Sequence, residues 1–144
     1  MTADTHQPHI LLIDDTQEIL DLMAELLEEE GYRVTCSLAL LDIAKVKALA
    51  PDVIIQDILF EETQELGWKF LTLVRLDPEL VQIPLILCTA AVRTIKEPEM
   101  ADQLDQLGIR VVLKPFTVEQ LVTTLREVLV AQRLISQAID RPPR

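Results

Sequence analysis

The sequence contains few glycines, cysteines and aromatic residues. Its 144 residues include three glycines and two cysteines, and only 3% of them are aromatic. The cysteines, Cys36 and Cys88, lie far apart in apolar runs, where a free cysteine is usually a buried thiol. The histidines, His6 and His9, have no cysteine cluster beside them, so the sequence argues against a zinc site.

Two further shortages exclude whole classes of protein. No apolar stretch approaches the ~20 residues that span a bilayer and no signal peptide opens the chain, so we expect a cytoplasmic protein with no membrane partner. Basic residues are scarce: 13 Lys and Arg face 24 Asp and Glu, for a net charge of −11. That balance argues against a broad nucleic-acid-binding surface. The length suits one domain, and 49% hydrophobic residues suffice for a full core.

Short apolar runs alternate with longer amphipathic segments. They predict strands over 9–13, 33–37, 52–56, 84–89 and 109–113, and helices over 17–30, 40–50, 67–75, 97–107 and 117–138. The strand runs are continuously apolar, which is typical of a parallel sheet covered on both faces. The predicted fold class is therefore α/β: a doubly wound, five-stranded parallel sheet with an extended C-terminal helix.

The chain divides into three expected parts: a flexible leader over 1–8, the domain over 9–130, and a helix extension and tail over 131–144. An apolar stripe continues past the domain in the last helix, through Val128, Leu129, Leu134, Ile135, Ala138 and Ile139. This stripe could pair with a second copy, lead into a further domain, or fray in water.

Polar residues stand where the predicted strands end. Asp14 and Asp15 follow the first strand, Asp57 the third, Thr89 ends the fourth and Lys114 follows the fifth. The carboxyl ends of parallel strands meet at one edge of a sheet, where ligands of such folds bind. Three clustered carboxylates need a cation, and hard oxygen ligands suit Mg²⁺. A hydroxyl and an ammonium beside a metal make a cradle for a phosphoryl group.

This constellation resembles the receiver domain of two-component response regulators, which has a flavodoxin-like fold. The resemblance runs from His9 nearly to Leu129. It rests on Asp14-Asp15, on PDVIIQDI around Asp57, and on the LCTA and LKPF stretches that carry Thr89 and Lys114. Each motif is weak alone, and their order at successive strand ends makes them specific together.

The resemblance implies roles in phosphoryl transfer. Asp57 would be the phosphoacceptor and would attack the phosphohistidine of a sensor histidine kinase or phosphotransfer protein. Lys114 would pair first with Asp57 and then with the phosphoryl oxygens, which Thr89 would also reach. Such a domain catalyses its own phosphorylation and dephosphorylation and is otherwise not an enzyme.

Mg²⁺ is the cofactor that the resemblance implies, bound by Asp14, Asp15 and Asp57 and by the backbone carbonyl of Leu59. The chain departs from the family after the phosphoacceptor position, where LFEETQELG (59–67) replaces a shorter loop with a proline. We expect this stretch to form a longer, acidic loop beside the site.

A second departure concerns the conformational switch. In the family the threonine at the position of Thr89 moves toward the phosphoryl group. This changes the packing of the face formed here by the helix over 97–107, the strand over 109–113 and the last helix, which is the usual output face.

That face, or the last helix, could also form a homodimer. The strand usually carries an aromatic switch residue where this chain has Val111, so the signal must travel by backbone shifts or helix packing. The segment over 89–108 is also longer than usual, which places extra residues before its helix.

Alternative functions stay open. No DNA-binding output domain is expected in this chain, which is either a stand-alone receiver that acts on a downstream protein or one piece of a longer protein. Val111 and the altered loop leave room for a phosphate-independent adaptor of the same fold. A metal-dependent phosphatase of the related doubly wound kind is less compatible, because its first strand ends in DxDx and this one ends in DDTQ.

Overall fold

The computed structural model describes the backbone of residues 7–57, 60–90 and 96–140, and the side chains in these ranges except those of residues 57, 60–65 and 135–140. Strands and helices alternate through this described part. Their bounds are β1 (His9–Asp14), α1 (Gln17–Glu29), β2 (Arg33–Ser37), α2 (Ile43–Leu49), β3 (Val53–Asp57), α3 (Phe60–Leu76), β4 (Leu85–Thr89), α5 (Pro98–Gln106), β5 (Ile109–Leu113) and α6 (Val118–Asp140).

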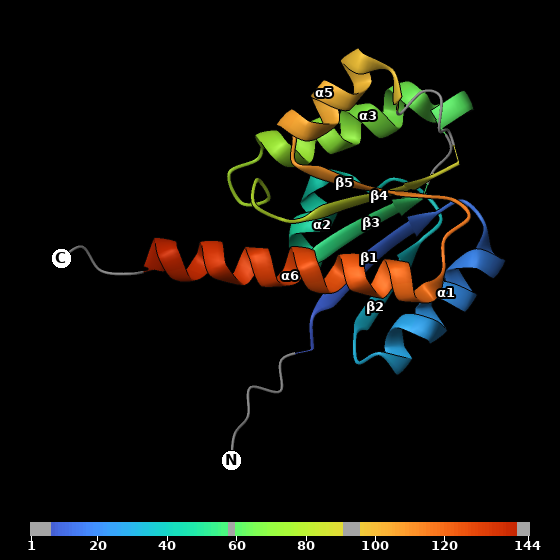
Figure 1. The fold of residues 1–144 in the computed structure, drawn as a ribbon, viewed down its shortest axis with the longest axis horizontal. Coiled ribbons are helices and arrows are strands. Elements are labelled where there is room, and N and C mark those ends of the chain that lie inside the picture. The colour runs from blue at the N-terminus through green and yellow to red at the C-terminus, as the bar shows by residue number, and fades with distance from the viewer. Residues whose placement is uncertain (1–6, 58–59, 91–95, 141–144) are drawn as a thin grey trace.

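The strands form one parallel sheet in the order β2-β1-β3-β4-β5. Helices α1 and α6 cover one face of the sheet, and helices α2, α3 and α5 cover the other (Figure 1). The strand order reverses between β1 and β3, so the carboxyl ends of these two strands lie at the topological switch point where such folds bind ligands. The predicted doubly wound, five-stranded α/β fold is confirmed.

Each strand supplies both cores, because successive side chains point to opposite faces. In β1, Ile10 and Leu12 face α1 and α6, whereas Leu11 and Ile13 face the other three helices, and all four side chains are fully buried. Continuous apolar strands are therefore what a sheet between two helix layers requires.

Helix α3 begins at Phe60, so the prediction of a loop over 59–67 is wrong from Phe60 onward. The segment is rich in Glu and Gln, which are good helix formers, and acidic residues near a helix N-terminus interact favourably with the helix dipole. Gly67 lies inside the helix, where an added Cβ would come within 3.1 Å of Gln56 Nε2. The glycine therefore lets α3 lie close over the sheet.

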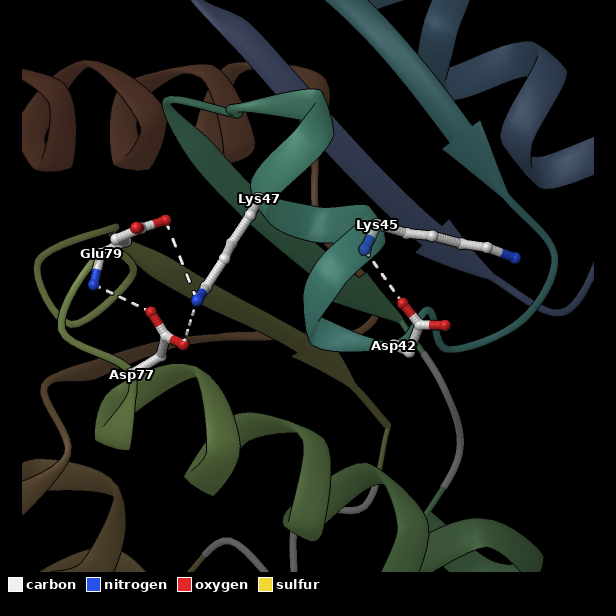
Figure 2. A network of polar contacts seen from close by, with 5 residues as sticks. All are labelled: Asp42, Lys45, Lys47, Asp77 and Glu79. Atoms are coloured by element: carbon white, nitrogen blue, oxygen red, sulfur yellow. Dashed lines mark hydrogen bonds and ion pairs between the residues drawn. The ribbon is translucent and has the colours of Figure 1, made fainter.

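Side-chain capping decides where one further helix begins. Helix α2 starts at Ile43 instead of residue 40, because the Asp42 side chain caps it by accepting a hydrogen bond of 2.9 Å from the Lys45 backbone N–H (Figure 2). Helix α1, by contrast, follows Thr16, which has extended backbone but whose side chain makes no capping hydrogen bond.

The remaining helix ends follow their sequence signals. Pro98 stands in the first turn of α5, and Gly108 follows that helix with a φ of +66°. Before α6, the Thr117 hydroxyl accepts from the Gln120 N–H at 3.0 Å and the Gln120 side chain accepts from the Thr117 N–H at 2.8 Å. This reciprocal capping box fixes where α6 begins.

Helix α6 continues beyond the sheet, as the C-terminal half of the helix in Figure 1 shows. Leu125 and Val128 are buried against the sheet, whereas Val130 and Leu134 are 54% and 60% exposed. Within the described residues, no helix combines the length and the apolar character that a membrane crossing requires.

The two cysteines differ in their surroundings. Cys88 is buried in the inner strand β4, as expected, but Cys36 is exposed, so the expectation of a buried thiol is wrong there. The reason is that Cys36 lies on the edge strand β2, which pairs on one side with β1 and is only partly covered by helices.

Polar contacts tie the elements together at the end of the sheet opposite the strand ends that carry the acidic residues. Lys47 Nζ of α2 lies 2.8 Å from Asp77 Oδ2 and 3.8 Å from Glu79 Oε2, which follow α3 (Figure 2). Asp77 also accepts the Glu79 backbone N–H at 2.8 Å. This network holds the turn after α3 against the end of α2.

His9, the first residue of β1, forms a second contact network at that end. Its Nε2 lies 2.7 Å from the Thr35 hydroxyl, its Nδ1 lies 3.1 Å from the Leu49 carbonyl, and its backbone N–H donates to Asp52 at 2.6 Å. Burial lowers the pKa of His9, and the nearby Arg33 charge lowers it further. The buried imidazole thus links three elements in its neutral form.

Candidate functional site

The acidic pair lies at the carboxyl end of β1, and its two members have different surroundings. Asp14 is buried, with 2% of its surface exposed, and its Oδ1 accepts a hydrogen bond of 2.8 Å from the Thr16 backbone N–H. Asp15 is exposed and accepts the Thr16 hydroxyl at 3.3 Å. The end of β1 therefore presents one buried carboxylate that a backbone hydrogen bond fixes and one carboxylate that is exposed to solvent.

The pairing of β1 with β3 places a third acidic residue next to this pair. Asp57 is the last residue of β3, and its Cα is the register partner of the Asp14 Cα. Paired strands lie about 4.8 Å apart, so the backbones at these two positions are direct neighbours. The Asp57 side chain and the whole of Leu59, including its backbone carbonyl, lie outside the described residues.

Thr89 and Lys114 come from the ends of the next two strands. Thr89 is 1% exposed at the end of β4, and Lys114 is half-buried after β5. The Lys114 backbone N–H donates to the Thr89 carbonyl at 2.9 Å, and the peptide bond between Lys114 and Pro115 is cis. The hydroxyl and the ammonium predicted for the site thus stand on adjacent strands.

The acidic residues at these strand ends fit a hard divalent cation. Its acidic members offer carboxylate oxygens, the ligand type that Mg²⁺ prefers. Among the side chains that the structure describes, no three acidic, histidine or cysteine groups converge on one point. The Asp57 carboxylate, which would be the third, is not among those side chains.

Val111 occupies the strand position for which an aromatic residue is typical. It is half-buried in β5, opposite Leu87 in β4, and packs against the core cluster beneath α3 and α5. Ala90, which follows Thr89, is exposed. The extra residues expected before α5 fall on 91–95, which lie outside the described residues.

An apolar hollow of about 470 Å³ adjoins Lys114 between α1 and the start of α6. Sequence reasoning missed it, because Ile19 and Leu22 share the helical spacing of the buried residues Leu20 and Met23. The signal that could have revealed it is the width of the apolar stripe on α1, which is wider than the stripe that a helix needs to cover the core. The hollow is lined by Ile19, Leu22, Met23, Leu26, Leu27, Ala90, Lys114, Pro115, Phe116, Val118 and Leu121.

Comparison with known proteins identifies the family of this fold. The sequence matches the response regulator receiver domain over residues 10–126. The chain therefore belongs to the family of response regulator receiver domains. Its fold is similar to that of the chemotaxis protein CheY4 of Vibrio cholerae, with 26% identity and a TM-score of 0.71, covering 85% of this chain and 99% of that one.

Other relatives give the same assignment. The N-terminal receiver domain of a response regulator from Methanoculleus marisnigri is 30% identical, with a TM-score of 0.62 and coverage of 84% and 95%. Among curated proteins, hybrid signal transduction histidine kinase D of Dictyostelium discoideum is 30% identical over 118 residues, 81% of this chain. The DNA-binding dual master transcriptional regulator RpaA of Synechocystis is 30% identical over 135 residues, 91% of this chain.

The chain spans 7% of the length of the histidine kinase and 53% of the length of RpaA. One relative is thus a kinase and the other a regulator, and receiver domains interact with histidine kinases and with downstream targets in two-component signal transduction. The family assignment confirms the resemblance drawn from the strand-end motifs.

Proposed function

We propose that this chain accepts a phosphoryl group on Asp57 from the phosphohistidine of a sensor kinase or phosphotransfer protein, and signals to a protein partner by changing conformation. The observation that carries the proposal is the β1/β3 register, which sets the Asp57 position directly beside buried Asp14 at the switch point of the sheet. Membership of the receiver family supports the same reading.

In the proposed reaction, a carboxylate oxygen of Asp57 attacks phosphorus and forms a P–O bond, while the P–N bond to the donor imidazole breaks. The electron pair of the broken bond stays on the imidazole nitrogen. The Lys114 ammonium would neutralise charge on the phosphoryl oxygens, and the Thr89 hydroxyl would donate a hydrogen bond to one of them.

Asp14, Asp15, Asp57 and the carbonyl of Leu59 are the groups proposed to hold Mg²⁺. The ion would supply charge neutralisation for the carboxylates and for the incoming phosphoryl oxygens. The different surroundings of the acidic pair support separate roles, since Asp14 is fixed by the Thr16 N–H and Asp15 is exposed to solvent. The same groups would later allow water to hydrolyse the acyl phosphate, which ends the signal.

The division into a core over 9–130 and an extension over 131–144, the cytoplasmic location and action without a DNA-binding domain in this chain remain parts of the proposal. The output is proposed to travel through the backbone of the segment after β4 and through the packing of α5 and α6, because Val111 lacks an aromatic ring that could turn inward.

Phosphorylation by acetyl phosphate with Mg²⁺, followed by intact mass, tests the proposal. We expect a phosphate-sized mass gain in the wild type and none in Asp57→Asn, whose amide is a poor nucleophile. Asp52→Asn, on a residue that binds the His9 N–H at the opposite end of the sheet, is the matched control and should be phosphorylated normally.

A second candidate, a phosphate-independent adaptor of the same fold, is favoured by Val111. The absence of any mass gain in the wild type, together with Mg²⁺ binding shown separately by calorimetry, would select this candidate.

A further inference from the structure

The two ends of helix α5 are held very differently. At its N-terminal end, Glu97 is the N-cap residue, and its side chain makes no capping hydrogen bond. Of the described side chains of α5, the buried one is Leu104, which is 3% exposed and lies in the second half of the helix. The first turn of α5 therefore lacks both a side-chain cap and a buried anchor, the contacts that usually fix the end of a helix.

A side chain of the neighbouring helix binds the other end. Arg75 lies in the last turn of α3, and its Nε donates a hydrogen bond of 2.5 Å to the carbonyl of Leu107, the C-cap residue of α5. Its Nη2 lies 3.4 Å from the carbonyl oxygen of Gly108. The last carbonyl groups of a helix have no partner within the helix and carry the negative end of its dipole. The Arg75 cation therefore caps α5 from outside that helix.

The same guanidinium group also binds a third segment. Its Nη1 lies 2.6 Å from the carbonyl oxygen of Ile83 and 3.1 Å from that of Val81, both in the turn before β4. Burial lowers the pKa of Arg75, yet a guanidinium group stays charged at neutral pH. Since its donors form a rigid planar fork, this one group fixes the end of α3, the turn before β4 and the end of α5 relative to one another.

The direction of α5 gives this contact its importance. The helix runs antiparallel to the strands, so its C-terminal end lies at the end of the sheet opposite the acidic strand ends (Figure 1). Its weakly held N-terminal end points back toward the acidic strand ends. A helix that is fixed at one end and weakly held at the other responds to a push by turning about the fixed end.

We propose that Arg75 is a positioning residue that anchors the C-terminal end of α5, so that the helix turns about this end when its N-terminal end is displaced. The anchor itself does not depend on phosphorylation. Its use in signalling rests on the proposed function, in which the packing of α5 carries the output.

Hydrogen exchange of single amides, measured by NMR on the full chain, tests the anchor. The Leu107 N–H bonds to the Gln103 carbonyl at 3.0 Å close to Arg75, and the Ala101 N–H bonds to the Glu97 carbonyl at 2.9 Å in the first turn. These amides report the local opening of the two ends. In the wild type we expect the Leu107 amide to exchange about ten-fold more slowly than the Ala101 amide, or slower still. Equal protection would overturn the proposal.

Removing the guanidinium group should release one end only. In Arg75→Gln we expect the Leu107 amide to exchange about ten-fold faster or more, because hydrogen bonds to a charged group are lost, while the Ala101 amide changes less than about two-fold. Arg126→Gln, on an exposed arginine 3.5 Å from Glu30 on the other face of the sheet, is the matched control and should change neither amide. Equal acceleration of both amides and of the strands would mean that Arg75 only stabilises the fold, and would overturn the anchor.

Arg75→Lys separates geometry from charge. Lysine keeps the positive charge, but its compact ammonium cannot replace the planar fork, so the Leu107 amide should exchange about three-fold faster or more. Wild-type exchange in this variant would show that charge alone suffices and overturn the guanidinium anchor. This milder replacement still decides the question if Arg75→Gln does not fold.

The role in signalling is measured on chains held phosphorylated by excess acetyl phosphate with Mg²⁺, with intact mass read in parallel. In the wild type we expect phosphorylation to change exchange of the Ala101 amide about three-fold or more and that of Leu107 less than about two-fold. In Arg75→Gln, which should gain mass at the wild-type rate, both amides should change. A mass gain with equal changes at both wild-type amides would overturn the pivot. No mass gain would reject the proposed function and leave the anchor to the exchange of the resting chain.

Discussion

Thr89 and Lys114 are joined through the backbone: the Lys114 N–H donates a hydrogen bond of 2.9 Å to the Thr89 carbonyl. Thr89 is the last residue of β4 and pairs with Leu113 of β5, and Lys114 is the next residue after Leu113. A displacement of the Thr89 backbone therefore acts directly on the residue that carries the ammonium. This connection needs no aromatic side chain, and it offers a route past Val111.

The charge of Lys114 gives the first prediction. Lys114→Gln replaces the ammonium with a neutral amide on a side chain one atom shorter, so phosphorylation by acetyl phosphate should slow by about 10²–10³-fold, the usual cost of losing one electrostatic stabiliser. The rate is read from the time course of the mass gain. Lys69→Gln, at an exposed position of α3, should keep the wild-type rate. Equal rates in both variants would contradict the role proposed for Lys114.

His9 makes stability depend on pH. Its folded-state pKa lies below the unfolded value of 6.5, because burial and then the Arg33 charge disfavour the imidazolium. The unfolded chain therefore takes up the proton first, and stability is lost as pH falls from 6.5 through the folded-state pKa. Urea unfolding of the wild type and of His9→Gln between pH 7.5 and 5 measures this contribution. We expect a steeper loss in the wild type, and parallel curves would contradict the prediction.

The buried side chain of Gln56 is expected to lower the stability of the fold. Its Oε1 is buried and has no hydrogen-bond partner among the described residues, which typically costs about 1–3 kcal/mol. Gln56→Leu replaces the amide with an apolar group of similar size, so the free energy of unfolding should stay the same or rise by about that amount. Chemical denaturation is the measurement. Gln106→Leu, on an exposed residue of α5, should have little effect, and a loss of more than about 1 kcal/mol in Gln56→Leu would reveal a missing partner.

The two parts of α6 should differ sharply in stability. Leu125 is fully buried against the sheet, so Leu125→Ala should lower the free energy of unfolding by about 2–5 kcal/mol. Val130 is 54% exposed five residues later, and Val130→Ala should change it by less than about 0.5 kcal/mol. Urea midpoints of the two variants compare them. A large loss in Val130→Ala would show that the extension is packed in solution, as a dimer would require, and sizing would then test for that dimer.

The sheet could be predicted from the sequence because β1, β3 and β4 contain continuous apolar runs between polar segments, and two further short strand-like stretches flank them in the chain. The site could be located because each polar residue directly follows such a run, and parallel strands bring these ends together. The positions of Thr89 and Lys114 on adjacent strands follow from that argument. Their chemical roles, and that of Asp57, remain predictions.

The errors arose where local contacts override periodicity. Helix α3 was predicted to start at Gly67, but this glycine lies inside the helix, where α3 passes close to Gln56 of β3. A contact between two elements cannot be seen in the local sequence pattern. Helix α2 starts later than its apolar spacing suggests, because the Asp42 side chain caps it. The hollow beside Lys114 was missed because the spacing of apolar residues in α1 does not show how much of its apolar surface α6 covers.

Helix α6 has a mechanical property that follows from its length. It begins four residues after Lys114 and runs for 23 residues, so it is about 34 Å long at 1.5 Å per residue. A rigid rod of that length acts as a lever: a tilt of about 5° at its first turn displaces its far end by about 3 Å. Movements too small to disturb the packing near the strand ends are thus largest at the part of α6 that extends beyond the sheet (Figure 1).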